Sequence, residues 1–179
     1  MKRNIFVIAV MLLIVVAGCN RSAKTTENDV KQAEAALFNE DMTANMEAVP
    51  QAIETFCKYA EENPEAENAP EYLFKAVEVS INTHQDAKQS IELVDKLVSG
   101  YPECDKDPVA LFMLASFVYE DQQQEYDKAR ETYRRIVDSY PDSPFAKDAA
   151  IAMKQVGMTP EQLIEMFEKG EKSEDGSQE

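Results

Sequence analysis

The residue types that most often carry chemistry are scarce in this chain of 179 residues, which has one histidine and three cysteines. The histidine, His84, stands in the polar stretch NTHQD, where we expect an exposed turn between two helices. A nucleophile activated by a histidine would depend on His84 alone, and the sequence has no glycine-rich phosphate loop and no Cys/His metal spacing. Carboxylate pairs are frequent, but among 34 acidic residues they arise by chance. We therefore expect a protein that is not an enzyme and that binds no cofactor and no metal.

The first cysteine, Cys19, follows a segment with the two parts of a signal peptide. Lys2 and Arg3 form a short positive region, and residues 5–17, IFVIAVMLLIVVA, form a nearly unbroken apolar run. This run is shorter than the roughly 20 residues that a transmembrane helix needs. It ends in the letters VAGC, which resemble the lipobox of bacterial lipoproteins. The alternatives are an uncleaved N-terminal helix and an ordinary signal peptide followed by a chance cysteine.

The lipobox resemblance implies that residues 1–18 are removed as a signal peptide and that Cys19 carries the lipid. Two or three acyl chains, such as palmitate, would then hold the protein on a membrane, because each buried methylene adds roughly 0.8 kcal/mol. In the sorting rule known for such lipoproteins, Asn20 implies the outer membrane. The net basic stretch NRSAK after the lipid site favours the side that faces the periplasm, although a surface orientation stays open.

The charge of the chain limits its partners. Without Lys2 and Arg3, 16 basic residues stand against 34 acidic ones, a formal charge of −18. Phosphate backbones and anionic lipid surfaces would be repelled, so we expect no nucleic acid partner and a membrane contact made by the lipid alone. Residues 27–71 hold twelve acids and two bases, whereas acids and bases balance in residues 124–154. The acidic half is either a solvated surface or a surface that meets a basic partner.

The other two cysteines, Cys57 and Cys104, could form a disulfide in an exported protein. The apolar pattern places Cys57 about two turns inside a helix and Cys104 in a loop after a later helix. A disulfide needs the two Cα atoms within about 7 Å. We therefore do not expect the two thiols to pair.

Three segments follow the signal peptide. Residues 19–26 form the lipidated cysteine and a short polar tether, residues 27–169 a helical repeat domain, and residues 170–179 a disordered acidic tail. The middle segment is assigned to helices because apolar residues recur every three or four positions and glycine is nearly missing. Helix starts are predicted where Asp107 and Ser143 each precede a proline, and where Thr159 and Gln162 have the spacing of a capping box.

A repeat governs the helical segment. Pro64, Pro102 and Pro141 end similar stretches and are spaced 38 and 39 residues apart. Twelve residues before each proline stands a small side chain, and eight and five residues before it stand larger ones: Ala52, Ser90 and Ala129; Phe56, Val94 and Tyr133; Tyr59, Leu97 and Ile136. A small residue lets two helices approach closely, and the proline stops the helix.

This pattern resembles the tetratricopeptide (TPR) repeat over residues 48–153. Residues of two helices occupy the packing positions of that repeat in the third copy: Leu111, Leu114, Ala115 and Val118, then Ala129, Tyr133, Ile136 and the terminal Pro141. The departures are a period longer than 34 residues, a two-residue excess between Ala115 and Ala129, and a degenerate first copy. The chain is similar to the TPR lipoproteins of outer-membrane protein assembly and to the periplasmic TPR domains of the Tol-Pal system.

The resemblance implies an all-α solenoid of helical hairpins, in which the helix from Pro160 to Lys169 would cap the last repeat. The leading helices would line a concave groove that binds a peptide, with these residues pointing into it: Leu73, Val77, Phe112, Ser116 and Tyr119. The competing interpretation is that neighbouring helices bury these side chains.

Two functions remain open on the sequence. The first is a membrane-anchored scaffold that holds envelope proteins, with a role in outer-membrane protein assembly. The second is a solute- or glycan-binding lipoprotein of an uptake system, which the lack of tryptophan disfavours. The pattern leaves the partner and the oligomeric state undetermined.

Overall fold

The computed structural model describes residues 24–102 and 104–175, and side chains as far as Glu168. The elements are helices: α1 (Glu27–Ala36), α2 (Val49–Glu62), α3 (Ala69–Asn82), α4 (Ala87–Gly100), α5 (Asp107–Met113), the π-helix η1 (Leu114–Gln122), α6 (Tyr126–Ser139), α7 (Pro144–Gln155) and α8 (Pro160–Asp175). The described part has no strand and only an isolated bridge between Phe38 and Ala44. None of its helices combines the length and the apolar character needed to cross a membrane. The predicted signal peptide and the predicted lipidation site, Cys19, lie outside the described residues.

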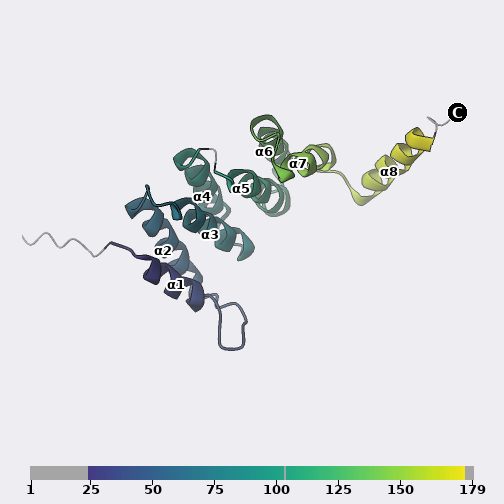
Figure 1. Ribbon diagram of the computed structural model, residues 1–179. Coiled ribbons are helices and arrows are strands. Elements are labelled where there is room, and N and C mark those ends of the chain that lie inside the picture. Colours follow the sequence, from purple (N-terminus) through teal and green to yellow (C-terminus); the bar gives the residue numbers. More distant parts are fainter. Residues whose placement is uncertain (1–23, 103, 176–179) are drawn as a thin grey trace, which may run out of the picture.

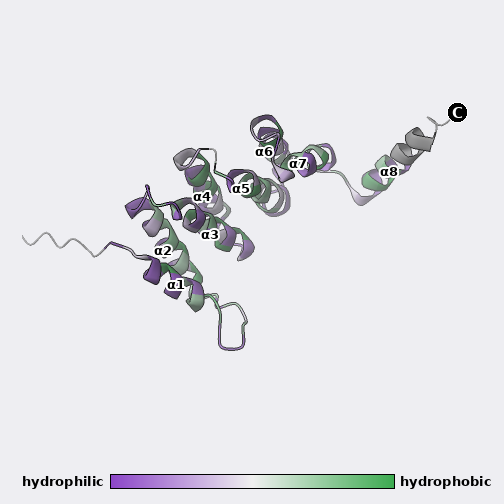
Figure 2. Cartoon of the chain, in the orientation of Figure 1, coloured by the Kyte–Doolittle hydropathy of each residue, from purple (hydrophilic) through white to green (hydrophobic). Residues whose placement is uncertain are grey.

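The helices are arranged as successive hairpins, which confirms the predicted solenoid (Figure 1). α1 packs on α2, α3 on α4, and the continuous helix α5–η1 on α6, while α2 contacts α3 and α6 contacts α7. One apolar core runs along these contacts, and Figure 2 shows apolar residues on the faces that neighbouring helices share. Its largest buried side chains are Tyr133, Phe56, Leu73, Leu97, Leu111 and Ile136.

The predicted repeat positions are confirmed as packing positions. The small residues Ala52, Ser90 and Ala129 are at most 1% exposed, and the larger residues that follow them are also buried. Each second helix ends in the same way, at Asn63, Tyr101 and Tyr140, with φ of −129°, −132° and −131°. In all three the backbone N–H donates to the carbonyl four residues earlier, and the proline that follows cannot continue the helix.

Helices begin at all three predicted starts, and two of them have the predicted cap. The hydroxyl of Ser143 accepts from the N–H of Phe145 at 3.1 Å. Thr159 and Gln162 form the capping box, with reciprocal bonds of 2.8 and 3.3 Å. At the third, α5 begins at Asp107, but this residue is the first of the helix and not its N-cap. Its buried carboxylate accepts from the Tyr140 hydroxyl at 3.1 Å instead.

The tether is shorter than predicted. The N–H of Thr25 donates to Glu62 Oε2 at 2.5 Å, and Asn63 Nδ2 donates to the Thr25 carbonyl at 3.3 Å. Thr26 then caps α1 through a capping box with Asp29, a signal that was present in the sequence. The folded body therefore includes Thr25 and Thr26, while residues 19–23 lie outside the described part.

The C-terminal helix departs from its predicted role as a cap. α8 leads away from α7 (Figure 1), and its Ile164 and Phe167 are 59% and 57% exposed. The backbone also stays helical from Gly170 to Asp175, where the tail was expected to begin. One glycine costs only about 1 kcal/mol in a helix, and the Glu, Lys and Asp residues around Gly170 tolerate helical geometry. Residues 176–179 lie outside the described part.

Candidate protein-binding groove

The structure places the predicted groove residues in three different environments. Leu73 and Val77 are 1% and 0% exposed, which supports the competing interpretation that neighbouring helices bury these two side chains. The reason is that α3 lies between α2 and α4, and its contacts with these helices bury most of its surface. Its accessible stripe carries Glu71, Lys75 and Glu78 instead, and Lys75 forms an ion pair with Glu34 of α1.

Phe112 and Ser116 are half-buried and are engaged within the fold. The Phe112 ring lies 5.4 Å from the ring of Tyr133 and 5.8 Å from that of Phe145, so it fills the space between helices. The Ser116 hydroxyl donates to the Phe112 carbonyl at 2.9 Å. These two residues support the packing of the third repeat and do not offer free side chains to a ligand.

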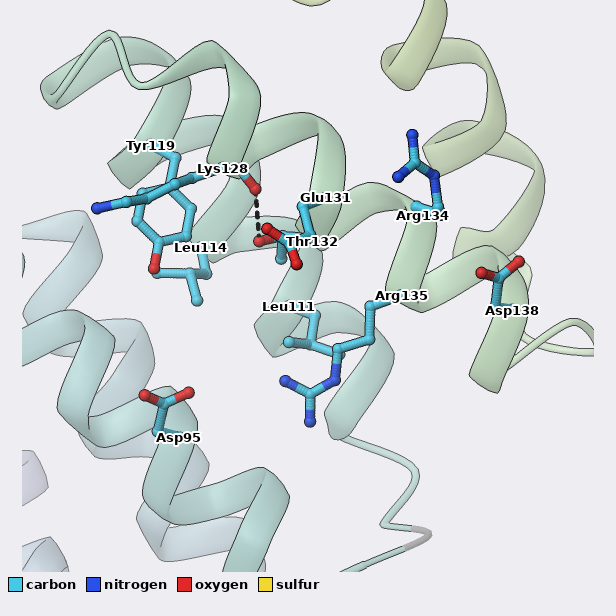
Figure 3. Close-up of a pocket in the computed structure, with 10 residues that line it drawn as sticks. All are labelled: Asp95, Leu111, Leu114, Tyr119, Lys128, Glu131, Thr132, Arg134, Arg135 and Asp138. Atoms are coloured by element: carbon cyan, nitrogen blue, oxygen red, sulfur yellow. Dashed lines mark hydrogen bonds between the residues drawn. The ribbon is translucent and has the colours of Figure 1, made fainter.

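Of the five predicted residues, Tyr119 lines a groove, which we call the α4–α6 groove (Figure 3). This groove has a volume of about 540 Å³ and lies between α4 and α6, with buried leucines of α5 and η1 at its floor. Its lining residues are Asp95, Leu111, Leu114, Tyr119, Lys128, Glu131, Thr132, Arg134, Arg135 and Asp138. It combines an apolar floor, one aromatic side chain and charged walls, which suits a segment of a protein partner.

The π-helix η1 determines where Tyr119 stands. The N–H of Gln123 donates to the Val118 carbonyl five residues back at 2.9 Å, and the N–H of Glu125 donates to the Tyr119 carbonyl at 2.7 Å. These wider turns accommodate the two extra residues between Ala115 and Ala129. Because π-helical turns are rare and often occur at functional sites, the position of η1 supports this groove as the candidate site.

Charges of both signs face each other across the groove. Lys128 forms an ion pair with Glu125 at 2.8 Å, and its Nζ lies 5.6 Å above the ring of Tyr119. The hydrogen bond to Glu125 raises the pKa of Lys128, and burial raises the pKa of Tyr119, so both keep their protons at neutral pH. Neither Arg134 nor Arg135 forms an ion pair within the described part of the chain.

Sequence reasoning missed the α6 residues that form the cationic wall. In Figure 3, Arg134 and Arg135 leave α6 in different directions, and both are lining residues of the groove. The available signal was the stretch 124–154, where acids and bases balance in an otherwise acidic chain. Spacing could not reveal that Asp95 of α4 would stand at the opposite wall.

The described residues hold no cluster of acidic, histidine or cysteine side chains suited to a metal ion. Cys57 and Cys104 are both free thiols and half-buried. Burial raises the pKa of Cys57 to about 11 and also raises that of Cys104, so neither thiol is activated as a nucleophile. His84 is exposed in the turn after α3, with a φ of 51°.

Comparison with protein families matches residues 109–143 to the tetratricopeptide repeat. The matched segment covers most of α5, all of η1 and all of α6, which form the third hairpin of the solenoid. The chain therefore contains TPR-like repeats, a fold that typically acts as a non-catalytic scaffold and binds protein partners. Comparisons with curated proteins and with solved structures give no match.

Proposed function

We propose that this TPR-like protein is a lipid-anchored scaffold of the bacterial cell envelope that binds a partner protein in the α4–α6 groove. One observation carries the choice of groove: nine of its ten lining residues, all except Asp95, belong to the matched repeat. Tyr119 offers a half-buried aromatic face, and Arg135 offers a guanidinium without an ion-pair partner in the described chain. A partner segment with an apolar side chain and a carboxylate would satisfy both groups.

The anchor belongs to the same proposal. Lipidation at Cys19 would attach the protein to the outer membrane on its periplasmic side, and a role in outer-membrane protein assembly follows from the likeness to TPR lipoproteins stated above. Because Thr25 is held by Glu62 and Asn63, at most about 20 Å of extended chain could separate the lipid site from the folded body. The end of the solenoid formed by α1 and α2 would then lie close to the membrane.

Incorporation of a palmitate analogue tests the anchor. We expect the wild-type chain to be labelled and to sediment with membranes, and the Cys19→Ala variant to lose both properties. Cys57→Ala serves as the matched control, because its thiol lies within the fold and should not affect labelling. Equal labelling of wild type and Cys19→Ala would disprove lipidation at Cys19. Digestion of intact cells by an external protease then distinguishes a surface orientation from the proposed periplasmic one.

Photo-crosslinking in the native host tests the groove. A photoreactive amino acid at Tyr119 or Thr132 should give a discrete cross-linked product with an envelope protein, and the same amino acid at the exposed Lys88 of α4 should not. The product should be lost when Arg135→Glu is added, with the fold checked by circular dichroism. The same product from Lys88, or a product unchanged by Arg135→Glu, would refute the groove. The glycan-binding alternative gains no support, because Tyr119 is the one aromatic side chain among the lining residues.

A further inference from the structure

The last helix pair of the solenoid is open. α7 follows Pro141 as α3 follows Pro64, so it has the place of a leading helix, and α8 has the place of the helix that should cover it. Within the described chain α8 leads away from α7 (Figure 1), and apolar side chains of both helices remain exposed. Ile151 of α7 is 44% exposed, and Ile164 and Phe167 of α8 are 59% and 57% exposed. Exposed apolar side chains on two consecutive helices, each within a stripe of exposed residues, indicate a contact that the single chain does not make.

The two exposed stripes are complementary in charge and spacing. On α7, Lys147, Ile151 and Lys154 lie four and three residues apart, on one helical face, and all three are exposed. On α8, read backwards, Glu168, Ile164 and Glu161 have the same spacing of four and three, and all are exposed. An antiparallel pairing therefore brings each lysine opposite a glutamate and the isoleucines opposite each other.

No like charges oppose each other in this pairing. Asp148, which lies beside the stripe on α7, falls opposite Phe167, and Ala150 falls opposite Glu165. The antiparallel direction is also the one that joins the helices of the preceding hairpins. The surface of α7 that would be covered thus continues the helix–helix contacts of the solenoid.

The junction between the two helices is fixed in the open arrangement. Val156 is 4% exposed, and its carbonyl accepts from Arg130 of α6 at 3.3 Å. Gly157 has a φ of +78°, and a Cβ at this position would lie 3.1 Å from the Tyr126 ring. Folding α8 back onto its own α7 would have to change this packed junction, whereas docking onto another molecule would leave it intact. Short junctions of this kind favour exchange of an element between molecules.

We propose that two copies of this chain exchange α8, so that α8 of each copy lies antiparallel on α7 of the other. The exchange is reciprocal and closed, with a twofold axis, and it covers the exposed isoleucines and Phe167 in both copies. It is independent of the α4–α6 groove, because none of the lining residues of that groove belongs to α7 or α8.

Charge reversal tests the exchange in the full chain, purified in density-matched detergent and studied by analytical ultracentrifugation. The first variant is Lys147→Glu/Lys154→Glu and the second is Glu161→Lys/Glu168→Lys. We expect wild type to be a dimer and each variant alone to dimerise at least about tenfold more weakly, because four ion pairs become repulsive. An equal mixture of the two variants should recover the dimer, because each α7 then meets an α8 of opposite charge.

The matched control is Lys31→Glu/Lys88→Glu, which makes the same charge change at exposed lysines of α1 and α4 and should leave the dimer intact. A wild-type chain that stays monomeric at about 100 µM would overturn the proposal and indicate that α8 closes on its own α7 or binds another protein. A dimer that neither variant weakens, or a mixture that stays monomeric, would overturn it as well.

Discussion

The hydroxyls of Ser80 and Ser90 lie 2.7 Å apart in the core between α3 and α4, and both residues are at most 1% exposed. Ser90 occupies the small-residue position that is alanine in the other two repeats, at Ala52 and Ala129. Sequence spacing predicted its size and burial, but not that its hydroxyl has a single partner across the helix pair. Each of these two hydroxyls therefore depends on the other for this hydrogen bond.

We expect Ser90→Ala to lower the free energy of unfolding by about 1–3 kcal/mol, because it leaves the Ser80 hydroxyl buried without this partner. The double variant Ser80→Ala/Ser90→Ala should recover most of that loss, since both polar groups are then removed. Urea unfolding followed by circular dichroism measures both. A double variant less stable than the single one would contradict this account.

The buried carboxylate of Asp107 predicts a pH dependence. Burial raises its pKa, and the hydrogen bond from Tyr140 only partly opposes this effect. The folded protein therefore holds this proton at pH values where the unfolded chain, with its ordinary pKa near 4, has released it. The stabilisation that the protonated Asp107 carboxyl contributes to folding is therefore fully present at low pH. It is lost as pH rises through the raised pKa of the folded state.

Asp107→Asn should remove that loss, so the stability of the variant relative to wild type should rise between pH 3.5 and pH 7. Comparison of urea midpoints across this range isolates Asp107, because the other carboxylates titrate in both proteins. A flat difference for Asp107→Asn would show that its carboxylate is not protonated preferentially in the folded state.

At the scale of elements, the two-residue excess of the third repeat also occurs in the second, between Ala76 and Ser90, and both repeats accommodate it in the turn after the leading helix. In both, the turn after the leading helix contains a residue in the left-handed region, His84 with a φ of 51° and Gln124 with a φ of 55°. Both turns also have an N–H that donates five residues back, Gln85 to Ser80 and Gln123 to Val118. In the third repeat this widening extends into η1 and positions Tyr119 at the groove.

Replacing Gln124 with glycine should stabilise the protein by roughly 0.5–1 kcal/mol. The left-handed conformation costs other residues about 1–2 kcal/mol, and the added freedom of glycine in the unfolded chain offsets part of that gain. The neighbouring Gln123→Gly is the matched control and should destabilise, because Gln123 has an ordinary φ of −101°. Thermal unfolding of both variants distinguishes them; equal effects would contradict the conformational explanation.

At the scale of the whole molecule, acidic residues accumulate at one end. Residues 27–71 carry twelve acids and two bases, whereas α6 carries the cations of the groove. Two ion pairs join acids of this part to lysines of α3 and α4, Glu34 with Lys75 and Glu61 with Lys96. Net repulsion among the remaining acids should still outweigh these two partly exposed pairs, because each contributes about 1 kcal/mol.

We therefore expect sodium chloride to stabilise the fold. Raising its concentration from about 0.02 to 0.3 M shortens the screening length below 10 Å and should raise the melting temperature by a few degrees. Glu40→Gln/Glu47→Gln, in the exposed loop before α2, should reduce the size of this salt effect. A melting temperature that falls with salt would mean that the interhelical ion pairs dominate.

The sequence by itself determined the hairpin repeat, because small residues such as Ala129 and terminal prolines such as Pro141 act through local geometry that spacing reveals. It also determined the helix starts at Ser143 and Thr159, whose hydrogen bonds join residues two and three positions apart. Only the tertiary structure decided which faces stay open, because burial depends on neighbours distant in the chain. Leu73 is enclosed by α2 and α4, Tyr119 is turned to the groove by η1, and α8 is directed away from α7 by a junction packed on Tyr126.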